Sequence, residues 1–151
     1  MNATRRRLLQ AAGAWFTCSL IPVPASATPV ALQGALRREF GKSPITPGRI
    51  TLDLPALAEN GNSVRVTVTA QSPMTETDHV ATIHLFAEHN PLPDIARFTL
   101  GPLSGRARVE TRIRVAAEQT ILAIARTNDG SLWSGSAHIV VTEAACLEAL
   151  Y

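Results

Sequence analysis

Residues 106–115 read RARVETRIRV and decide the fold class of the chain. Small or apolar residues occupy alternate positions in this stretch: Ala107, Val109, Ile113 and Val115. The alternation has the period of two that is typical of a β-strand with one face on a core and the other in solvent. The stretch therefore predicts a half-buried strand.

The same period recurs on both sides of this stretch. Alternating segments cover residues 49–54, 63–70, 80–88 and 95–100. Residues 120–125 are almost continuously apolar, which is typical of a strand buried on both faces. The tight-turn sequence Asn128-Asp129-Gly130 joins that segment to a last predicted strand over residues 132–142. The chain thus has about seven predicted strands.

A helical pattern is found only near the start of the expected domain. Leu32 and Leu36 lie one helical turn apart within residues 28–40, and Gly41 follows as a stop signal. Pro44 and Pro47 then mark a linker. Together with the strands, this pattern predicts an all-β fold: an immunoglobulin-like antiparallel β-sandwich of about seven strands with a short N-terminal helix.

The first residues have the organisation of an export signal. Arg5-Arg6-Arg7 precede two leucines, a short apolar stretch follows, and Ala25-Ser26-Ala27 matches a small-x-small cleavage site. The arginines resemble those of twin-arginine signals. We expect residues 1–27 to be a twin-arginine-type signal peptide and the product to be periplasmic. The alternative is an uncleaved anchor, but the apolar stretch is short for a membrane span, so no stable membrane anchor is expected.

Removal of that signal would reverse the sign of the net charge. The full chain has 14 basic and 12 acidic residues, and the predicted signal contains three of the basic ones, so the remainder has 11 and 12 and a net charge of −1. A nucleic-acid partner is therefore not expected, because such binding needs a clustered basic surface. We expect residues 28–142 to form one domain and residues 143–151 to form a C-terminal carrier arm or docking tail.

Four arginines share the predicted outward face of one strand: Arg106, Arg108, Arg112 and Arg114. Their positive charges could contact a small anion or an acidic partner. The alternative is an ordinary solvated strand face whose charge is tempered by Glu110.

The histidines do not predict a metal site. His79, His84 and His89 recur at intervals of five residues, and His138 is distant. The alternation places His84 with Glu88 on the outward, solvent-facing side of its strand. A metal ion needs three or four convergent ligands, which this spacing does not supply. We therefore expect no metal and no bound cofactor.

The familiar enzyme motifs are also missing. Gly101 and Gly105 lack the lysine and the helix of a phosphate-binding loop. Ser134 beside Gly135 lacks the strand-turn-helix context of a hydrolase nucleophile. We therefore do not expect an enzyme.

Cys146 is the single cysteine expected after removal of the signal, because Cys18 lies within the signal. An exported chain with one cysteine cannot form an internal disulfide. The thiol is then free, joined to another chain, or attached to a chemical group. Its thiolate form is the nucleophile that attacks sulfur. A thiol packed beneath the tail is a further alternative.

Seven segments, taken in order, resemble the SoxY family, the sulfur-carrier subunit of bacterial thiosulfate oxidation. They are Leu52-Asp53-Leu54-Pro55, Ala58-Glu59-Asn60-Gly61, Val64-x-Val66, Ser72-Pro73-Met74, Phe86 with Asn90-Pro91-x-Pro93, Arg112-Ile113-Arg114 and the run from Gln119 to Asp129-Gly130. The resemblance extends over nearly all of the chain that follows the predicted signal. It implies an immunoglobulin-like fold and a heterodimer with a SoxZ-like subunit.

The resemblance also implies a function for Cys146. In the SoxY family, a C-terminal cysteine carries thiosulfate-derived sulfur between a haem c-type loading protein, a sulfate-releasing hydrolase and a sulfur dehydrogenase. Alignment of the last strand, residues 139–142, places Cys146 at the carrier position. The implied function is that of a carrier without a cofactor of its own, on which the sulfur is the covalent cargo.

The tail departs from the family pattern, in which glycine pairs flank the cysteine. Ala144-Ala145 and Leu147-Glu148 replace those glycines, and Ala149-Leu150-Tyr151 extend the tail. Glycine gives an arm low bulk and free backbone rotation, whereas this composition favours helix. The departure leaves an alternative open: a non-carrier scaffold subunit that pairs with a SoxZ-like chain and uses its cysteine in an interface or a disulfide.

Overall fold

A computed structural model of the chain describes residues 30–143, in which one helix precedes nine strands. The helix α2 covers Val30–Phe40. The strands are β1 (Ile45–Pro47), β2 (Ile50–Asp53), β3 (Leu57–Asn60), β4 (Val64–Ala70), β5 (Val80–Ala87), β6 (Asp94–Thr99), β7 (Arg108–Ile113), β8 (Gln119–Thr127) and β9 (Leu132–Glu143). A short 3-10 turn, η1 (Pro102–Ser104), lies between β6 and β7.

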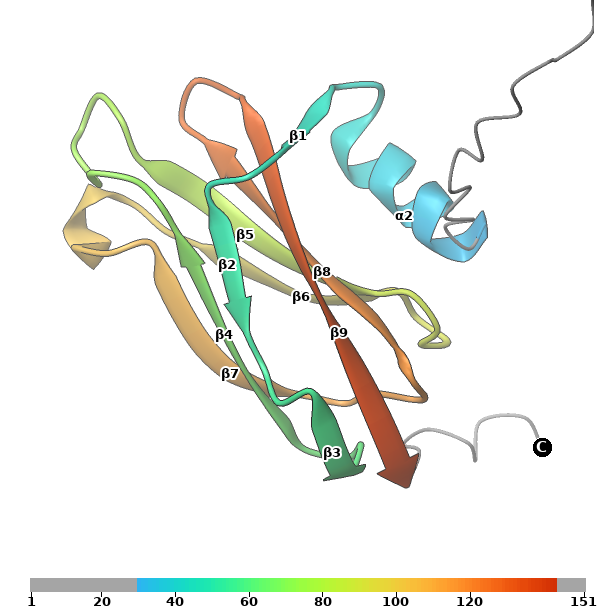
Figure 1. Ribbon diagram of the computed structural model, residues 1–151. Coiled ribbons are helices and arrows are strands. Elements are labelled where there is room, and N and C mark those ends of the chain that lie inside the picture. The colour runs from blue at the N-terminus through green and yellow to red at the C-terminus, as the bar shows by residue number, and fades with distance from the viewer. Residues whose placement is uncertain (1–29, 144–151) are drawn as a thin grey trace, which may run out of the picture.

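The strands form two sheets that face each other (Figure 1). The large sheet has the order β1-β9-β8-β5-β6, with β3 also paired to β9, and the small sheet has the order β2-β4-β7. Fully buried side chains of β4, β5 and β8 meet between the sheets, among them Val66, Val68, Ile83, Leu85 and Ile121. On β4 and β5 these are the side chains that the period of two predicts to point inward, so this part of the core follows directly from the alternation.

Helix α2 adds a third layer on the other side of the large sheet (Figure 1). Its buried residues Leu32 and Phe40 pack against Phe86 of β5 and Ile124 of β8. These two central strands are therefore buried on both faces. For β8 this confirms the prediction from its continuous apolar run.

The predicted fold class is confirmed: the protein is an immunoglobulin-like sandwich with a short N-terminal helix. All seven predicted strands are present. Two strands were missed, β1 and β3, and both pair in parallel with β9. They have only three and four residues, and β1 includes a proline, so neither is long enough to show an alternating pattern.

The chain passes from the large sheet at β1 to the small sheet at β2 beside Gly135. A β-carbon at Gly135 would lie only 2.5 Å from the carbonyl oxygen of Ile50. The crossing therefore requires glycine for close backbone approach.

Residues 1–27, the predicted signal, lie outside the described residues, as does most of the predicted tail. Within residues 30–143, no helix is long and apolar enough to cross a membrane.

Candidate functional site

The place where the chain leaves the sandwich is well defined. At the end of β9, the carbonyl oxygen of Glu143 accepts a 2.8 Å hydrogen bond from the amide of Gly61. The carbonyl of Gly61 in turn accepts a 2.8 Å bond from the amide of Val115, two residues after the end of β7. The hydroxyl of Thr142 donates to the carbonyl of Glu59 at 2.9 Å. These bonds fix the last described residues at the end of the sandwich where β7 ends (Figure 1).

Cys146 itself lies outside the described residues, three positions after Glu143. Its role as the sulfur attachment site therefore stays a prediction. The structure describes the residues around Glu143, the residue after which the segment with Cys146 begins.

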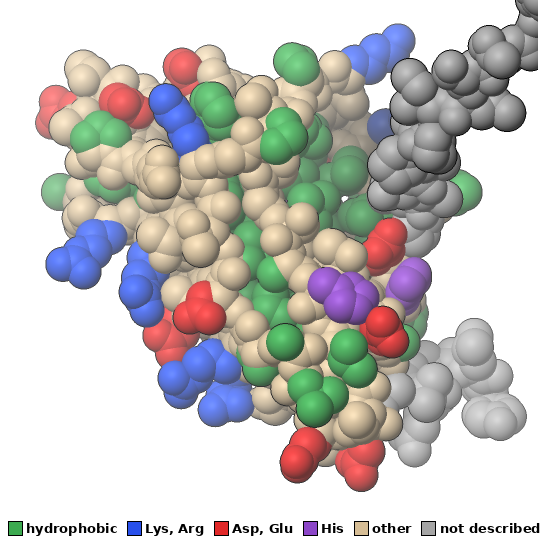
Figure 2. Space-filling model, viewed as in Figure 1, with side chains coloured by type: hydrophobic (Ala, Val, Ile, Leu, Met, Phe, Trp, Pro, Cys, Tyr) green, Lys and Arg blue, Asp and Glu red, His purple; other side chains and the backbone are tan. Residues whose placement is uncertain are grey.

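The four predicted arginines are all exposed on the outer side of β7 and the residues flanking it: Arg106, Arg108, Arg112 and Arg114. The side chains of Ala107, Ile113 and Val115 are buried on the other side, as the alternation predicts. Charged side chains gather on this side of the molecule in Figure 2, with acidic ones among the basic ones.

Strand pairing adds a fifth arginine to this face. Arg65 of β4 lies directly opposite Arg112 of β7. The charges of this face are only partly paired: Glu110 lies 3.3 Å from Arg65 and 3.9 Å from Arg108. Glu110 therefore tempers the middle of the face, and the positive charges at its two ends remain in excess.

His84 is not a surface residue, and the prediction that it faces solvent is wrong. Its side chain does point to the outer face of β5, but α2 covers that face and leaves the residue only 1% exposed. The imidazole stacks against Phe86, with ring planes 7° apart, and meets Phe40 edge-on. Alternation alone does not show that a second layer covers a face.

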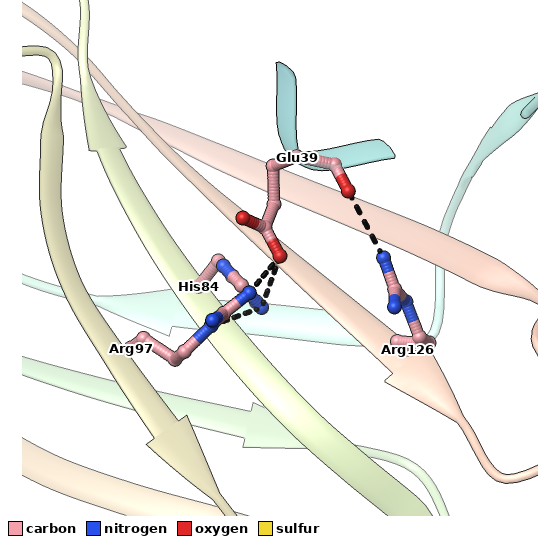
Figure 3. A network of polar contacts seen from close by, with 4 residues as sticks. All are labelled: Glu39, His84, Arg97 and Arg126. Carbon is pink, nitrogen blue, oxygen red and sulfur yellow. Dashed lines mark hydrogen bonds and ion pairs between the residues drawn. The ribbon is translucent and has the colours of Figure 1, made fainter. Parts of the chain in front are cut away.

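His84 belongs to a polar network between α2 and the large sheet (Figure 3). Arg97 of β6 donates from Nε to His84 Nε2 at 3.3 Å and forms an ion pair with Glu39. Arg126 of β8 donates to the backbone carbonyl of Glu39 at 3.2 Å. The network attaches the end of α2 to β5, β6 and β8, so its role is structural.

Burial favours the neutral form of the His84 imidazole. Burial lowers the pKa of His84; the carboxylate of Asp94 opposes this shift, and the positive charge of Arg126 adds to it. Because Nε2 accepts from Arg97, the proton of the neutral ring lies on Nδ1. That atom is buried and has no hydrogen-bond partner among the described residues.

The other histidines lie apart from His84. His79 precedes β5 and contacts the carbonyl of Thr75, whereas His89 follows β5 and contacts the carbonyl of Glu118. His138 lies 3.1 Å from the Glu118 carboxylate. In the part of the chain that the structure describes, no group of three or more potential ligands could hold a metal ion.

A polar cleft of about 300 Å³ lies at the end of the sandwich formed by the β8–β9 turn, opposite the end of β9. Sequence patterns did not predict it. Arg49, whose φ is +60°, stacks 4.4 Å above the ring of Trp133, and Asp78 and Asn128 line the same cleft. Three separate loops bring these residues together, and no sequence spacing indicates that.

Most of the chain matches one known protein family. The model of the family "Sulfur oxidation protein SoxY" matches residues 36–146. The solved structure of the sulfur carrier protein SoxY from Chlorobium limicola f thiosulfatophilum is 28% identical, with a TM-score of 0.62, and the match covers 74% of this chain and 96% of that one. Among curated proteins, no sequence matches the chain.

Superoxide reductases share the fold. The protein from Ignicoccus hospitalis is 18% identical with a TM-score of 0.55, over 62% of this chain and 80% of that one. A putative superoxide reductase from Thermotoga maritima is 22% identical with a TM-score of 0.56, over 66% and 95% of the two chains. At these identities the likeness extends to the fold alone. The SoxY model, in contrast, matches well over half of the sequence, and the chain therefore belongs to the SoxY family.

Proposed function

We propose that the chain is a periplasmic sulfur carrier that binds thiosulfate-derived sulfur covalently on Cys146 and presents it to Sox enzymes. The observation that carries the proposal is the extent of the family match, which runs through residues 36–146 and so includes Cys146 at its last position. The similar protein from Chlorobium limicola is described as a sulfur carrier.

The loading step is an oxidation. The Cys146 thiol and thiosulfate combine into a Cys–S–S–SO3⁻ adduct, with one new sulfur–sulfur bond, and release one proton and two electrons. A haem c-type loading protein would accept the electrons. Later enzymes would remove sulfate and oxidise the remaining sulfur. The carrier supplies the thiolate, since the thiolate is the form that attacks sulfur.

The described residues suit a carrier because the sandwich holds the end of β9, after which Cys146 follows, in a defined position. The hydrogen bonds of Glu143, Gly61 and Val115 tie the two sheets together where the chain leaves β9. Cys146 follows after three residues, a span of at most about 10 Å. The cysteine is thus attached within about 10 Å of the end of the sandwich.

A test of the proposal is mass analysis of the protein isolated from thiosulfate-grown cells. We expect sulfur-containing adducts on the peptide that contains Cys146 and on no other peptide. A peptide that carries only free thiol, in cells that contain the loading enzyme, would contradict the proposal.

We also propose that the chain pairs with a SoxZ-like subunit and is exported through the twin-arginine pathway. Co-purification of a SoxZ-like chain in a one-to-one complex would support the heterodimer, and a homodimer alone would contradict it. Replacement of Arg5 and Arg6 by lysine should retain the precursor in the cytoplasm if the signal is of the twin-arginine type.

The second candidate is a scaffold subunit that keeps the partner contacts without carrying sulfur. It is favoured by Ala144-Ala145 and Leu147-Glu148, which replace the flanking glycines of the family arm. The variant Cys146→Ser separates the two candidates. A carrier predicts loss of thiosulfate oxidation with the dimer retained, whereas a scaffold predicts near-normal oxidation.

A further inference from the structure

Three arginines cluster on the small sheet, at the end of the sandwich where β9 of the large sheet ends: Arg65, Arg112 and Arg114, called here the arginine triad. Arg65 and Arg112 are direct partners in the β4–β7 ladder. Arg114 lies two residues after Arg112, between the buried residues Ile113 and Val115, and is therefore exposed on the same side. Like charges directly opposite each other destabilise a sheet. A bound anion would offset that cost.

The charges of the triad are incompletely matched within the described residues. Glu110 pairs with Arg65, and both side chains are about half exposed or more. Arg112 donates from one nitrogen to the carbonyl and hydroxyl of Ser63, both at 3.3 Å. The guanidinium of Arg114 has no hydrogen bond or ion pair with another described residue. A guanidinium offers five N–H donors, so most of the donors of Arg112 and Arg114 remain available.

The triad lies close to Glu143, the last described residue of β9. Glu143 is joined to Gly61, and Gly61 to Val115, by one backbone hydrogen bond each. Two steps between hydrogen-bonded strands span about 10 Å. The three residues from Glu143 to Cys146 also span at most about 10 Å. The thiol of Cys146 is therefore within reach of the residue that follows Arg114.

We propose that the arginine triad binds the sulfonate group of the adduct on Cys146, an inference that rests on the proposed carrier function. A sulfonate carries a negative charge on three oxygens, which suits the planar fork of guanidinium donors. The site would hold the loaded cysteine against the sandwich between encounters with enzymes. Hydrolytic removal of sulfate leaves a persulfide on the cysteine, which lacks the three sulfonate oxygens and would be held less tightly by the guanidinium groups.

Chemical sulfonation of the cysteine tests the site without any loading enzyme. In a full-length Cys18→Ser chain, Cys146 is the single thiol and is converted to its S-sulfonate with sulfite and a mild oxidant. The side-chain Nε–H resonances of the arginines are then followed by NMR. We expect the signals of Arg112 and Arg114 to shift on sulfonation, and those of Arg106 and Arg108 to stay in place. Unchanged signals for Arg112 and Arg114 would overturn the inference.

The rate of thiol modification gives a second readout. In the same chain, the double variant Arg112→Gln/Arg114→Gln should react with the dithionitrobenzoate dianion roughly threefold to tenfold more slowly, since two nearby positive charges are lost. The neutral reagent dithiodipyridine should slow less, because it responds only to the smaller fraction of thiolate and carries no charge for the arginines to attract. At about 1 M salt, where the screening length is only about 3 Å, the difference should vanish.

The matched control is Arg106→Gln/Arg108→Gln, which removes the same charge from the other end of the same strand. Arg106 lies six residues before Arg112, or about 20 Å along a strand, which is beyond the screening length at physiological salt. An equal slowing in the control, or an equal slowing with both reagents, would contradict a local site. Failure of either readout leaves the carrier proposal standing, since that proposal depends on adduct formation in cells.

Discussion

The outer faces of the two sheets carry similar charged side chains and differ in what covers them. On the large sheet, α2 covers the outer face, and Arg97 and Arg126 each contact Glu39 beside a buried histidine. On the small sheet, no described residue covers the outer face, and its arginines outnumber its acidic partners. Both faces carry charged residues, and what differs is whether another layer packs over them. Under a packed layer the charged residues stabilise the fold, whereas on an open face they remain available to a ligand.

The largest expected effect on stability comes from removing packing between α2 and the large sheet. Phe40 is 5% exposed and packs against Phe86 and His84. The substitution Phe40→Ala should lower the free energy of unfolding by about 3–5 kcal/mol, because it opens a cavity beneath α2. Urea denaturation measures the change. Val30→Ala, at an 86% exposed position of the same helix, is the control and should stay within about 0.5 kcal/mol of wild type.

A smaller effect is expected where the chain passes between the two sheets. Gly135→Ala places a methyl group against the Ile50 carbonyl and should cost about 1–3 kcal/mol. Gly34→Ala, within α2 and with nothing in contact distance, should instead stabilise the protein by about 0.5–1 kcal/mol. Thermal unfolding of both variants tests the pair. If Gly135→Ala left the stability unchanged, β9 and β2 would not approach each other closely at this position.

The buried histidine should make the stability of the covered face depend on pH. Because burial lowers the pKa of His84, the unfolded chain binds the proton more readily than the folded one. The stabilising contribution of neutral His84 should therefore be fully present above about pH 6.5. Below that pH the free energy of unfolding should fall, by at most about 1.4 kcal/mol per pH unit. His84→Phe should flatten this dependence between pH 7 and about pH 5. An unchanged slope would assign the acid sensitivity to other groups.

The smallest effect on stability is expected on the uncovered face. Arg112→Gln/Arg114→Gln should change the free energy of unfolding by no more than about 0.5 kcal/mol, because surface ion pairs contribute little. Chemical denaturation at low and high salt checks this. A loss comparable to that of Phe40→Ala would show that the arginines hold the fold together.

The sequence was informative where a pattern is local and repeated. The alternation around Val66 and Ile113 predicts which side chains form the core, and the continuous run of β8 predicts burial on both faces. The positions of the four arginines on the outer side of β7 follow from the same period.

Other features depend on contacts between distant segments. The burial of His84 requires knowing that α2 covers β5, and the addition of Arg65 to the arginine face requires the register between β4 and β7. The short strands β1 and β3 owe their conformation to β9 and not to their own sequence. The cleft at Arg49 and Trp133 joins three loops that no spacing connects.

In the proposed function, Cys146 takes up sulfur and no residue of the sandwich reacts. The most direct measurement is a single-turnover reaction of the Cys18→Ser chain, in complex with its partner subunit, with radiolabelled thiosulfate and the haem c-type loading protein. We expect about one label per chain, retained after denaturation, released by a thiol reductant and absent from the same chain with Cys146→Ser. A chain that takes up no label under these conditions, or that is still labelled without Cys146, would rule out sulfur carriage on this cysteine.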